Sequence, residues 1–251
     1  MRLENKVAIV TGGGSGIGRA TALAFAAEGA RVVVADVMVD GGEETAKMIR
    51  DVHGQALFVK ADVSNAEQVK GMVDQAIEAF GRLDCAANNA GISLLPISVS
   101  RCTEDSWDKM IAINLKGAFL CMKYELPKII KSGGGSIVNT SSVIGLVADG
   151  GHPAYAASKH GVIGLTKTAA IQYAKAGIRV NAVCPGVIRT PMSEKTFAEH
   201  PELKALSIGM QPMDRIAEAD EVARAIVWLC TDEASFITGH ALPIDGGYLA
   251  R

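Results

Sequence analysis

Two side chains four residues apart, Tyr155 and Lys159, carry the clearest chemistry in this sequence. The residues around them have helical spacing, so both side chains are expected on one face of a helix, about one turn apart. A lysine ammonium close to a phenol favours the phenolate and lowers the pKa of the phenol. Such a tyrosine is a general base that takes a proton from an alcohol near neutral pH. A core tyrosine beside a solvated lysine has the same spacing, so the interpretation depends on the rest of the chain.

A glycine cluster lies between an expected strand at 7–10 and an expected helix at 17–28. Its pattern is G-x-x-x-G-x-G. Glycine lets the backbone turn sharply and approach a pyrophosphate, which the helix N-terminus attracts. A flexible turn is the alternative, but the position between a strand and an apolar helix favours nucleotide binding. The residues expected to contact a dinucleotide here are Gly12, Ser15, Gly16, Ile17 and Gly18.

An acidic side chain, Asp36, follows the second expected strand at 31–35. A Rossmann fold places an acid there against the adenosine ribose hydroxyls, although an aspartate at a strand end can also simply begin a turn. A 2′-phosphate would be repelled by this carboxylate. The glycine loop holds Ser15 where a basic residue would offset the phosphate, and Arg19 and Arg31 are expected not to reach it. The sequence therefore predicts NAD rather than NADP as the cofactor.

Small and polar residues also follow the third and fourth expected strands, at 56–60 and 83–88. Each of them alone is ordinary turn chemistry. Several strand ends in succession with such residues are what a ligand crevice at the carboxyl edge of a parallel sheet requires. The residues expected there are Asp62 and Val63 near the adenine, and Asn89, Ala90 and Gly91 where the backbone passes close to the cofactor.

The elements that position these residues alternate between short apolar runs and amphipathic helices, which predicts a Rossmann-type α/β fold with a parallel sheet covered on both faces. A length of 251 residues suits one domain over 1–251. Further strands are expected at 136–141, 178–184 and 241–245, and further helices at 42–52, 64–80 (opened by a capping box at Ser64), 103–131 (capped by Thr103), 155–176 and 219–231. Residues 191–212 are the least regular stretch and are expected to form a substrate lid.

Composition narrows the class of function. A formal charge of −2 without a basic cluster argues against nucleic acid as a partner. The chain contains no apolar run of about 18 residues and no signal peptide at its start, so neither a membrane span nor secretion is expected. Five dispersed cysteines fit reduced thiols in a cytoplasmic protein. The five histidines show no ligand spacing, and no metal is expected.

Taken together, these residues resemble the short-chain dehydrogenase/reductase family, with matching motifs from 11 to 186 and at 244–247. The resemblance implies four catalytic residues, Asn114, Ser142, Tyr155 and Lys159. Ser142 would hold the substrate oxygen beside Tyr155, which takes the hydroxyl proton as hydride leaves the carbinol carbon. Lys159 would also hold the nicotinamide ribose, and Asn114 would steady a water that relays protons. Alternatively, Asn114 satisfies a neighbouring backbone kink. Ser141 is expected to be structural.

The resemblance also assigns the segment after the sixth strand to the nicotinamide carboxamide. The residues that it implies there are Pro185, Gly186, Val187, Ile188 and Thr190. It further suggests a homotetramer with 222 symmetry. The expected helix at 155–176 is small or apolar almost all round, and the helix that contains Phe119 has the same character, so one face of each needs a partner.

These expectations combine into an NAD-dependent dehydrogenase of a secondary alcohol, or a ketone reductase in reverse. The substrate walls are expected at 93–97, 143–146 and 191–212, and their apolar side chains suit a hydrophobic or alicyclic substrate. The lid side chains can equally well pack the lid down, and His152 can line the substrate mouth or lie in a surface loop. The alternatives are a 3-oxoacyl-carrier-protein reductase, a sugar or polyol dehydrogenase, and a nucleotide-sensing scaffold without turnover.

Overall fold

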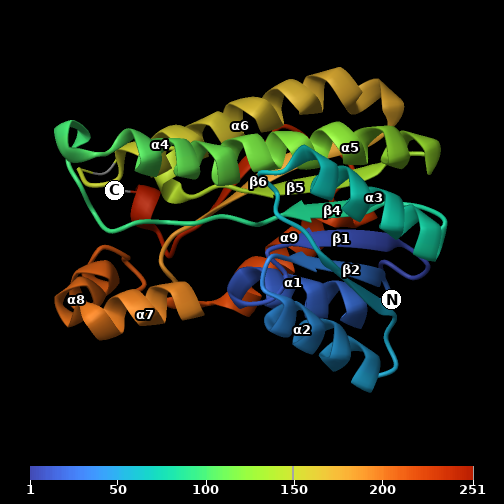
Figure 1. Ribbon diagram of the computed structural model, residues 1–251, viewed down its shortest axis with the longest axis horizontal. Helices are drawn as coiled ribbons and strands as arrows, with labels where there is room; N and C mark the ends of the chain where they lie inside the picture. Colours follow the sequence, from blue (N-terminus) through green and yellow to red (C-terminus); the bar gives the residue numbers. More distant parts are fainter. Residues whose placement is uncertain (149, 251) are drawn as a thin grey trace.

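A seven-stranded sheet forms the centre of the protein in the computed structural model, which describes residues 1–148 and 150–250 (Figure 1). The strand order is β3-β2-β1-β4-β5-β6-β9, and every neighbouring pair is parallel. The strands are β1 (Val7–Thr11), β2 (Arg31–Asp36), β3 (Ala56–Lys60), β4 (Cys85–Asn88), β5 (Gly135–Thr140), β6 (Ile178–Pro185) and β9 (Ala241–Ile244). The predicted Rossmann-type parallel sheet is thereby confirmed.

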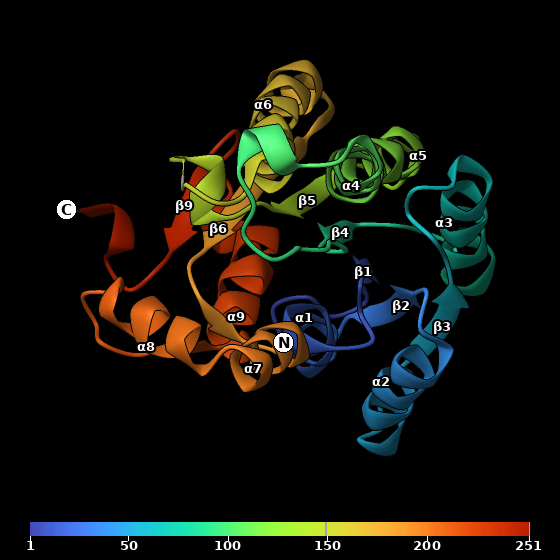
Figure 2. The same cartoon turned by 60° about the vertical axis from the view of Figure 1, so that its left-hand side comes forward.

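Helices cover both faces of the sheet, so each inner strand is buried on two sides and reads as a continuous apolar run. Figures 1 and 2 show α3, α5 and α6 on one face and α1, α2 and α9 on the other. Two apolar clusters fill these two interfaces. The helices are α1 (Gly16–Ala27), α2 (Val39–Asp51), α3 (Ala66–Phe80), α4 (Glu104–Met110), α5 (Gly117–Lys131), α6 (Pro153–Tyr173), α7 (Pro191–Glu199), α8 (Pro201–Gly209) and α9 (Ala219–Cys230).

The strand register brings the predicted site residues to one edge of the sheet. The strand order reverses at β1, which pairs with β2 on one side and β4 on the other. Thr11 at the end of β1 is in register with Ala35 and with Asn88. The glycine loop, Asp36 and the segment after β4 therefore leave the sheet side by side, at the position where open α/β sheets bind ligands.

The expected helix at 103–131 is interrupted. Thr103 caps its start as predicted, because its hydroxyl accepts a hydrogen bond from the backbone N–H of Ser106 at 3.2 Å. Between α4 and α5, however, residues Ile111–Lys116 form a π-helical turn. Such turns locally widen a helix and often occur at functional sites. Asn114 lies in the centre of this turn.

The start of α3 differs from the prediction. Its cap is Asn65, whose side chain accepts from the backbone N–H groups of Glu67 and Gln68. Ser64, which was expected to open a capping box, instead donates its hydroxyl to Asp62 at 2.7 Å. The cap of α3 is therefore one residue later than predicted, since asparagine caps a helix at least as well as serine.

The stretch 191–212 is more regular than expected, since it contains the helix pair α7 and α8. Pro191 and Pro201 each stand in the first turn of one of these helices, where a missing N–H costs nothing. The pair lies beside the carboxyl edge of the sheet (Figure 2). A short parallel pair, β7 (Ile188–Arg189) and β8 (Ala217–Glu218), joins the two ends of the segment.

The five cysteines are free thiols, and four of them are buried. Within the described ranges, no helix combines the length and the hydrophobicity that a membrane crossing demands.

Candidate functional site

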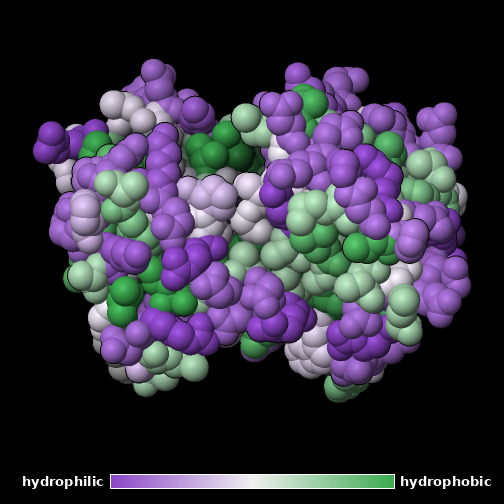
Figure 3. Space-filling model, turned by 90° about the horizontal axis from the view of Figure 1, so that it is seen from below, coloured by the Kyte–Doolittle hydropathy of each residue, from purple (hydrophilic) through white to green (hydrophobic). Residues whose placement is uncertain are grey.

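A cleft of about 780 Å³ lies at the carboxyl edge of the sheet. Figure 3 shows this side of the molecule hollowed between two rims, with pale and apolar side chains in the hollow and hydrophilic ones around it. The walls of the cleft come from the carboxyl ends of the six strands β1 to β6 and the segments that follow them, and from α1, α6, α7 and α8. Of the predicted cofactor residues, those that line it are Gly12, Ser15, Gly16, Ile17, Asp36, Asp62, Val63, Asn89, Ala90, Gly91, Tyr155, Lys159, Pro185, Gly186, Val187, Ile188 and Thr190.

The glycine loop forms one end of the cleft. Gly12 and Gly16 have φ angles of 65° and 51°, a left-handed conformation that side chains disfavour. Gly18 does not appear among the described residues that line the cleft. A Cβ at Gly18 would lie 1.9 Å from the carbonyl oxygen of Gly12, so its contribution is to let α1 pack closely on the loop. The result is a helix N-terminus directed at the cleft, which suits an anionic pyrophosphate.

Asp36 lines the cleft next to this loop, and its carboxylate is held by two backbone donors. The N–H of Gly14 donates to Oδ2 at 2.8 Å, and the N–H of Met38 donates to Oδ1 at 2.9 Å. The carboxylate is therefore fixed in place before any ligand arrives. This orientation suits acceptance of hydrogen bonds from ribose hydroxyls.

Arg19 lies closer to this end of the cleft than its position in the sequence suggested. Its guanidinium donates to the carbonyl oxygen of Gly14 at 2.6 Å and to that of Gly41 at 3.3 Å. The same group forms an ion pair with Glu44 on α2. Arg19 therefore approaches the neighbourhood of Asp36, but Glu44 balances its charge. Arg31, in contrast, stacks on Phe80 at the other end of β2, as expected.

Tyr155 and Lys159 project from the first turns of α6 into the cleft. The Nζ of Lys159 lies 5.5 Å from the centre of the Tyr155 ring and donates to the carbonyl oxygen of Thr140 at 2.8 Å. Lys159 is buried, and this burial lowers the pKa of its ammonium to about 8. It is thus still positively charged at neutral pH. Thr140 at the end of β5 was not foreseen, although its place at a strand end was a signal.

Asn114 is buried behind the cleft and does not line it within the described part of the chain. Its Oδ1 accepts from the backbone N–H of Ile92 at 2.8 Å, and its Nδ2 donates to the carbonyl oxygen of Ile92 at 2.9 Å. Nδ2 also contacts the hydroxyl of Ser158 at 3.3 Å. The side chain therefore fastens the segment after β4 to the π-helical turn, and so holds Gly91 close to Lys159.

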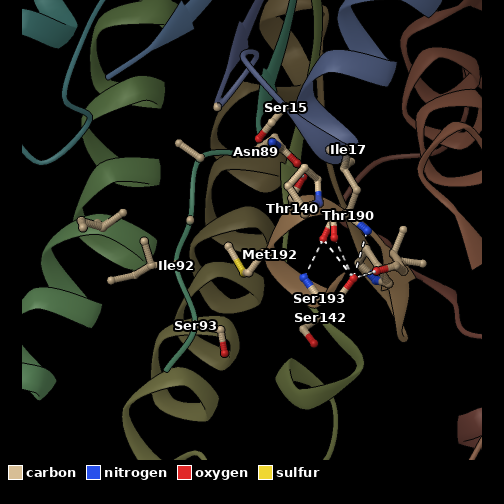
Figure 4. A pocket seen from close by; sticks show the side chains of 18 of the residues that line it. Ser15, Ile17, Asn89, Ile92, Ser93, Thr140, Ser142, Thr190, Met192 and Ser193 are labelled. Atoms are coloured by element: carbon tan, nitrogen blue, oxygen red, sulfur yellow. Dashed lines mark hydrogen bonds between the residues drawn. The ribbon is translucent and has the colours of Figure 1, made fainter. Parts of the chain in front are cut away.

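Ser142 and Ser141 follow β5 and have different surroundings. The Oγ of Ser142 accepts from the N–H of Ile144 at 3.2 Å, and Ser142 lines the cleft (Figure 4). Ser141 also lines the cleft, and it donates its hydroxyl to the carbonyl oxygen of Lys159 at 2.9 Å. This contact ties α6 to the end of β5; the structural role expected for Ser141 stays a prediction.

The segment after β6 passes along the cleft into α7. Thr190 caps α7 through a reciprocal pair of bonds, in which its Oγ1 accepts from the N–H of Ser193 and its N–H donates to the Ser193 hydroxyl (Figure 4). Ser193 was not predicted. Because both residues line the cleft, the start of α7 is locked next to the predicted nicotinamide end.

The predicted substrate walls are present only in part. Ser93, Met192 and Phe197 line the cleft, and in Figure 4 Met192 lies at the same end as Ser93 and Ser142. Most of the other apolar residues named for the walls stay exposed; these are Leu94, Leu95, Ile97, Leu146, Leu206 and Met213. Polar groups that were not foreseen also contribute, namely Thr196 and Ser207. The substrate end is therefore less apolar than expected.

His152 is not among the described residues that line the cleft. Its ring meets that of Tyr155 edge-on, with the centroids 6.3 Å apart. It is also the residue before the first turn of α6. His152 therefore contacts the tyrosine from the side.

The features of the cleft fit a nicotinamide dinucleotide. Its glycines leave space for a ligand that lies close to the backbone, and a helix N-terminus faces the expected position of the pyrophosphate. A fixed carboxylate, that of Asp36, lies at the expected position of the ribose. The described residues contain no group of histidine, cysteine and carboxylate side chains that suits a metal ion.

Comparison with known proteins agrees with this geometry. A family model described as enoyl-(acyl carrier protein) reductase matches residues 12–249. The chain is 43% identical over 249 residues to a 2,5-dichloro-2,5-cyclohexadiene-1,4-diol dehydrogenase of Sphingobium indicum, covering 99% of this chain and 98% of that protein. The chain is a short-chain dehydrogenase/reductase. It is therefore an oxidoreductase that acts on CH–OH groups and binds a nicotinamide cofactor.

Other members of the family are similarly close. A cyclohexanol dehydrogenase of an Acinetobacter species is 41% identical, with 100% of this chain and 97% of that protein covered. A 3-oxoacyl-[acyl-carrier-protein] reductase of Thermotoga maritima is 44% identical, with coverages of 98% and 99%. The crystal structure of levodione reductase superposes with a TM-score of 0.95 at 40% identity, and covers 99% of both chains. The short-chain dehydrogenase fold thus extends over the chain.

Proposed function

We propose that this short-chain dehydrogenase oxidises secondary alicyclic alcohols with NAD, or reduces the corresponding ketones. The observation that carries the proposal is that Tyr155, Lys159 and Ser142 meet in one cleft with the fixed carboxylate of Asp36. The relatives named for cyclohexanol and for a chlorinated cyclohexadiene diol support an alicyclic substrate. Met192 and Phe197 supply apolar contact area for such a ring.

The roles of the residues follow from their positions. A nicotinamide cofactor, when bound, supplies the acceptor for a hydride. Ser142 donates a hydrogen bond to the substrate oxygen and orients the hydroxyl toward Tyr155. Tyr155 accepts the hydroxyl proton as a general base. The positive charge of Lys159, held close to the ring by Thr140, stabilises the phenolate that forms.

The same residues act in the reverse direction. Tyr155 then donates its proton to the carbonyl oxygen that becomes an alcohol. Asn114 keeps the segment after β4 against Lys159, and we propose that it also helps to steady a water between Lys159 and solvent. Ser93, which lines the cleft, is proposed to contact the distal side of the substrate.

NAD is proposed as the cofactor because the adenosine end of the cleft carries a fixed negative charge. The carboxylate of Asp36 is held by two backbone donors, and Glu44 offsets the nearby Arg19. A 2′-phosphate would bring about 1.5 to 2 further negative charges to this position. The repulsion favours NAD.

A 3-oxoacyl-carrier-protein reductase is the second candidate, favoured by the 44% identity to the Thermotoga maritima enzyme. Such an enzyme must bind a long thioester-linked arm. The exposed apolar residues near 94–97 are compatible with that arm. The charge at Asp36, however, is unfavourable to the NADPH that such reductases generally use.

A direct screen distinguishes the two candidates. Initial rates are measured with NAD and NADP on cyclohexanol and a polyol, and with NADH and NADPH on cyclohexanone and a 3-oxoacyl thioester. We expect the highest kcat/KM for cyclohexanol or cyclohexanone with NAD(H). A clear preference for the thioester with NADPH would establish the second candidate, and no turnover of any substrate would contradict both.

We further propose a cytoplasmic homotetramer. Buried free thiols suit a reducing compartment. Large apolar side chains are exposed on α4, α5 and α6, which lie along one side of the molecule (Figure 1). They are Trp107, Phe119, Ile130 and Ile171. Covering them with a second copy would remove this apolar surface from water.

A further inference from the structure

A carboxyl group without a role in the proposed chemistry lies in the core behind the cleft. Glu125 on α5 is completely buried. Its Oε2 accepts a hydrogen bond from the Nδ2 of Asn88 at 3.1 Å. Asn88 is the last residue of β4, directly before the segment that lines the cleft. Burying an unpaired carboxylate in such a place would cost a large amount of free energy.

The hydrogen bonds around Asn88 have a fixed direction. Thr166 on α6 donates its hydroxyl to the carbonyl oxygen of Val162 at 2.8 Å, so it accepts from the Nδ2 of Asn139 at 2.9 Å. The Oδ1 of Asn139 then accepts from the Nδ2 of Asn88 at 3.0 Å. Both N–H groups of Asn88 are thereby used, one toward Asn139 and one toward Glu125. A flipped Asn88 amide would face two acceptors, so its orientation is also determined.

Two oxygens remain at the end of this chain of bonds. Among the described residues, Asn88 Oδ1 and Glu125 Oε1 are buried side-chain atoms without a hydrogen-bond partner. They belong to two planar groups that are already joined by one hydrogen bond. A proton on Oε1 would provide the missing donor, and Oδ1 would provide its acceptor. One proton shared between these two oxygens would satisfy both atoms and close a cyclic acid–amide pair.

The charges around Glu125 favour this neutral form. The charged pair of Asp74 and Lys128, between α3 and α5, lies at the surface, with the two groups 2.9 Å apart. Lys159 on α6 is directed at a backbone carbonyl of β5. The titratable neighbour on α5 is the thiol of Cys121, whose pKa is raised chiefly by burial, so that this neighbour is uncharged. Burial raises the pKa of Glu125 to about 7, and the hydrogen bond from Asn88 opposes this rise. No cation of the described residues contributes to stabilising the carboxylate.

We propose that Glu125 is a neutral carboxylic acid that donates its proton to Asn88 and acts as a positioning residue for the floor of the cleft. The hydrogen-bonded chain ties together the ends of β4 and β5 and the helices α5 and α6. Asn88 precedes Asn89, and Asn139 precedes Thr140, whose carbonyl oxygen holds Lys159. The pair therefore fixes the strand ends from which the cofactor and the catalytic lysine are held.

The protonation state is tested first, without any need for turnover. A difference infrared spectrum of wild type against Glu125→Gln near pH 6 should show the carbonyl band of a protonated carboxyl in the wild type. The exposed Glu78 on α3 provides the matched control. The difference spectrum of wild type against Glu78→Gln should lack this band, because both proteins contain Glu125. If the wild type instead shows a carboxylate band that Glu125→Gln lacks, Glu125 is ionised and the proposal is overturned.

The pH dependence of stability gives a second readout. Unfolded Glu125 ionises near 4.5, whereas the folded group stays neutral to about 7. The unfolded state therefore binds fewer protons between these values, and the stability of wild type must fall as pH rises across this window. In Glu125→Gln, the glutamine N–H replaces the carboxyl proton at any pH. The Tm of wild type relative to that of Glu125→Gln should thus decrease from about pH 5 to about pH 7; a constant or increasing difference would contradict a neutral Glu125.

The positioning role is tested with steady-state kinetics. Glu125→Gln should keep kcat and the KM for the cofactor close to wild type. Glu125→Met keeps the volume but leaves the Asn88 amide unpaired, and the KM for the cofactor should rise about tenfold, with a smaller change in the KM for the alcohol. Equal kinetics for both variants would show that Glu125 has no positioning role. If Glu125→Met does not fold, a Glu125→Gln enzyme with impaired cofactor binding would equally refute the proposal.

Discussion

In the cleft, the almost completely buried Lys159 donates a hydrogen bond to one backbone carbonyl, that of Thr140. Burial alone would drive Lys159 toward its neutral form, and its pKa is indeed lowered to about 8. The bond to the carbonyl of Thr140 and the adjacent ring of Tyr155 favour the charged form. The charge therefore lies next to the group that it is proposed to activate.

The variant Tyr155→Phe removes the proton acceptor and leaves the ring in place. Turnover should fall by about 10²–10⁴-fold, because loss of a general base removes the group that takes the proton of the alcohol. Binding of NADH, measured by fluorescence titration, should change little. Tyr173→Phe on the far end of α6 is the matched control and should behave like wild type. Near wild-type turnover in Tyr155→Phe would refute the proposed base.

The proposed preference for NAD depends on one carboxylate, that of Asp36. Two unit charges about 4 Å apart near a protein surface repel by about 4 kcal/mol, and even half of this exceeds a tenfold preference. Wild type should therefore prefer NAD to NADP at least about tenfold in kcat/KM. Asp36→Ala should lose most of this preference, whereas Asp40→Ala, which changes an exposed carboxylate on α2, should keep it. Equal use of both cofactors by wild type would show that Asp36 does not face the ribose.

The helix pair α7 and α8, which is proposed to cover the substrate, contributes residues to the cleft and is anchored at its start by the reciprocal cap between Thr190 and Ser193. Phe197 and Met192 on α7 both line the cleft, but Phe197 is buried whereas Met192 is 49% exposed. Phe197 therefore also packs α7 down, and Met192 is the better position at which to test contact with the substrate.

Met192→Ala tests whether α7 contacts the substrate. Since Met192 is half exposed, its truncation should hardly change Tm, but it removes apolar contact with a bound ring. The KM for cyclohexanol should rise about fivefold to tenfold while the KM for NAD stays constant. Met48→Ala on α2, at a position 39% exposed and outside the cleft, should leave both unchanged. An unchanged KM for the alcohol in Met192→Ala would place the substrate elsewhere.

At the level of the whole molecule, four large apolar side chains are exposed along α4, α5 and α6. Phe119 is 46% exposed and Ile171 is 82% exposed. A monomer would leave these groups in water, and a symmetric pairing of the same helices from two copies would cover them. The proposed tetramer therefore rests on this surface and on the family.

Light scattering at micromolar concentration should give four times the 26.2 kDa mass of the chain. Phe119→Asp introduces a charge into the expected interface and should reduce the mass to that of a dimer or a monomer. Val52→Asp, at the end of α2 with a side chain 72% exposed, should leave the mass unchanged. A wild-type monomer would exclude the proposed assembly.

The sequence by itself determined the order of strands and helices, the glycine loop, Asp36, and the one-turn spacing of Tyr155 and Lys159. Each of these depends on residues a few positions apart, where periodicity and backbone conformation are local properties. For that reason the predicted strand boundaries agree with the observed ones within two residues. The catalytic roles of these residues stay predictions, because each role depends on how the substrate and the cofactor bind.

Only the tertiary structure decided which distant groups meet. Lys159 donates a hydrogen bond to the carbonyl oxygen of Thr140, and Asn114 accepts one from the backbone of Ile92. Arg19 forms an ion pair with Glu44. Glu125 accepts the last hydrogen bond of a chain that starts on α6. The partners in these four pairs lie 19 to 37 residues apart in the sequence, so no local pattern reveals them. Burial also sets the pKa values of Lys159 and Glu125, and burial exists only once the sheet and its two helical layers have packed.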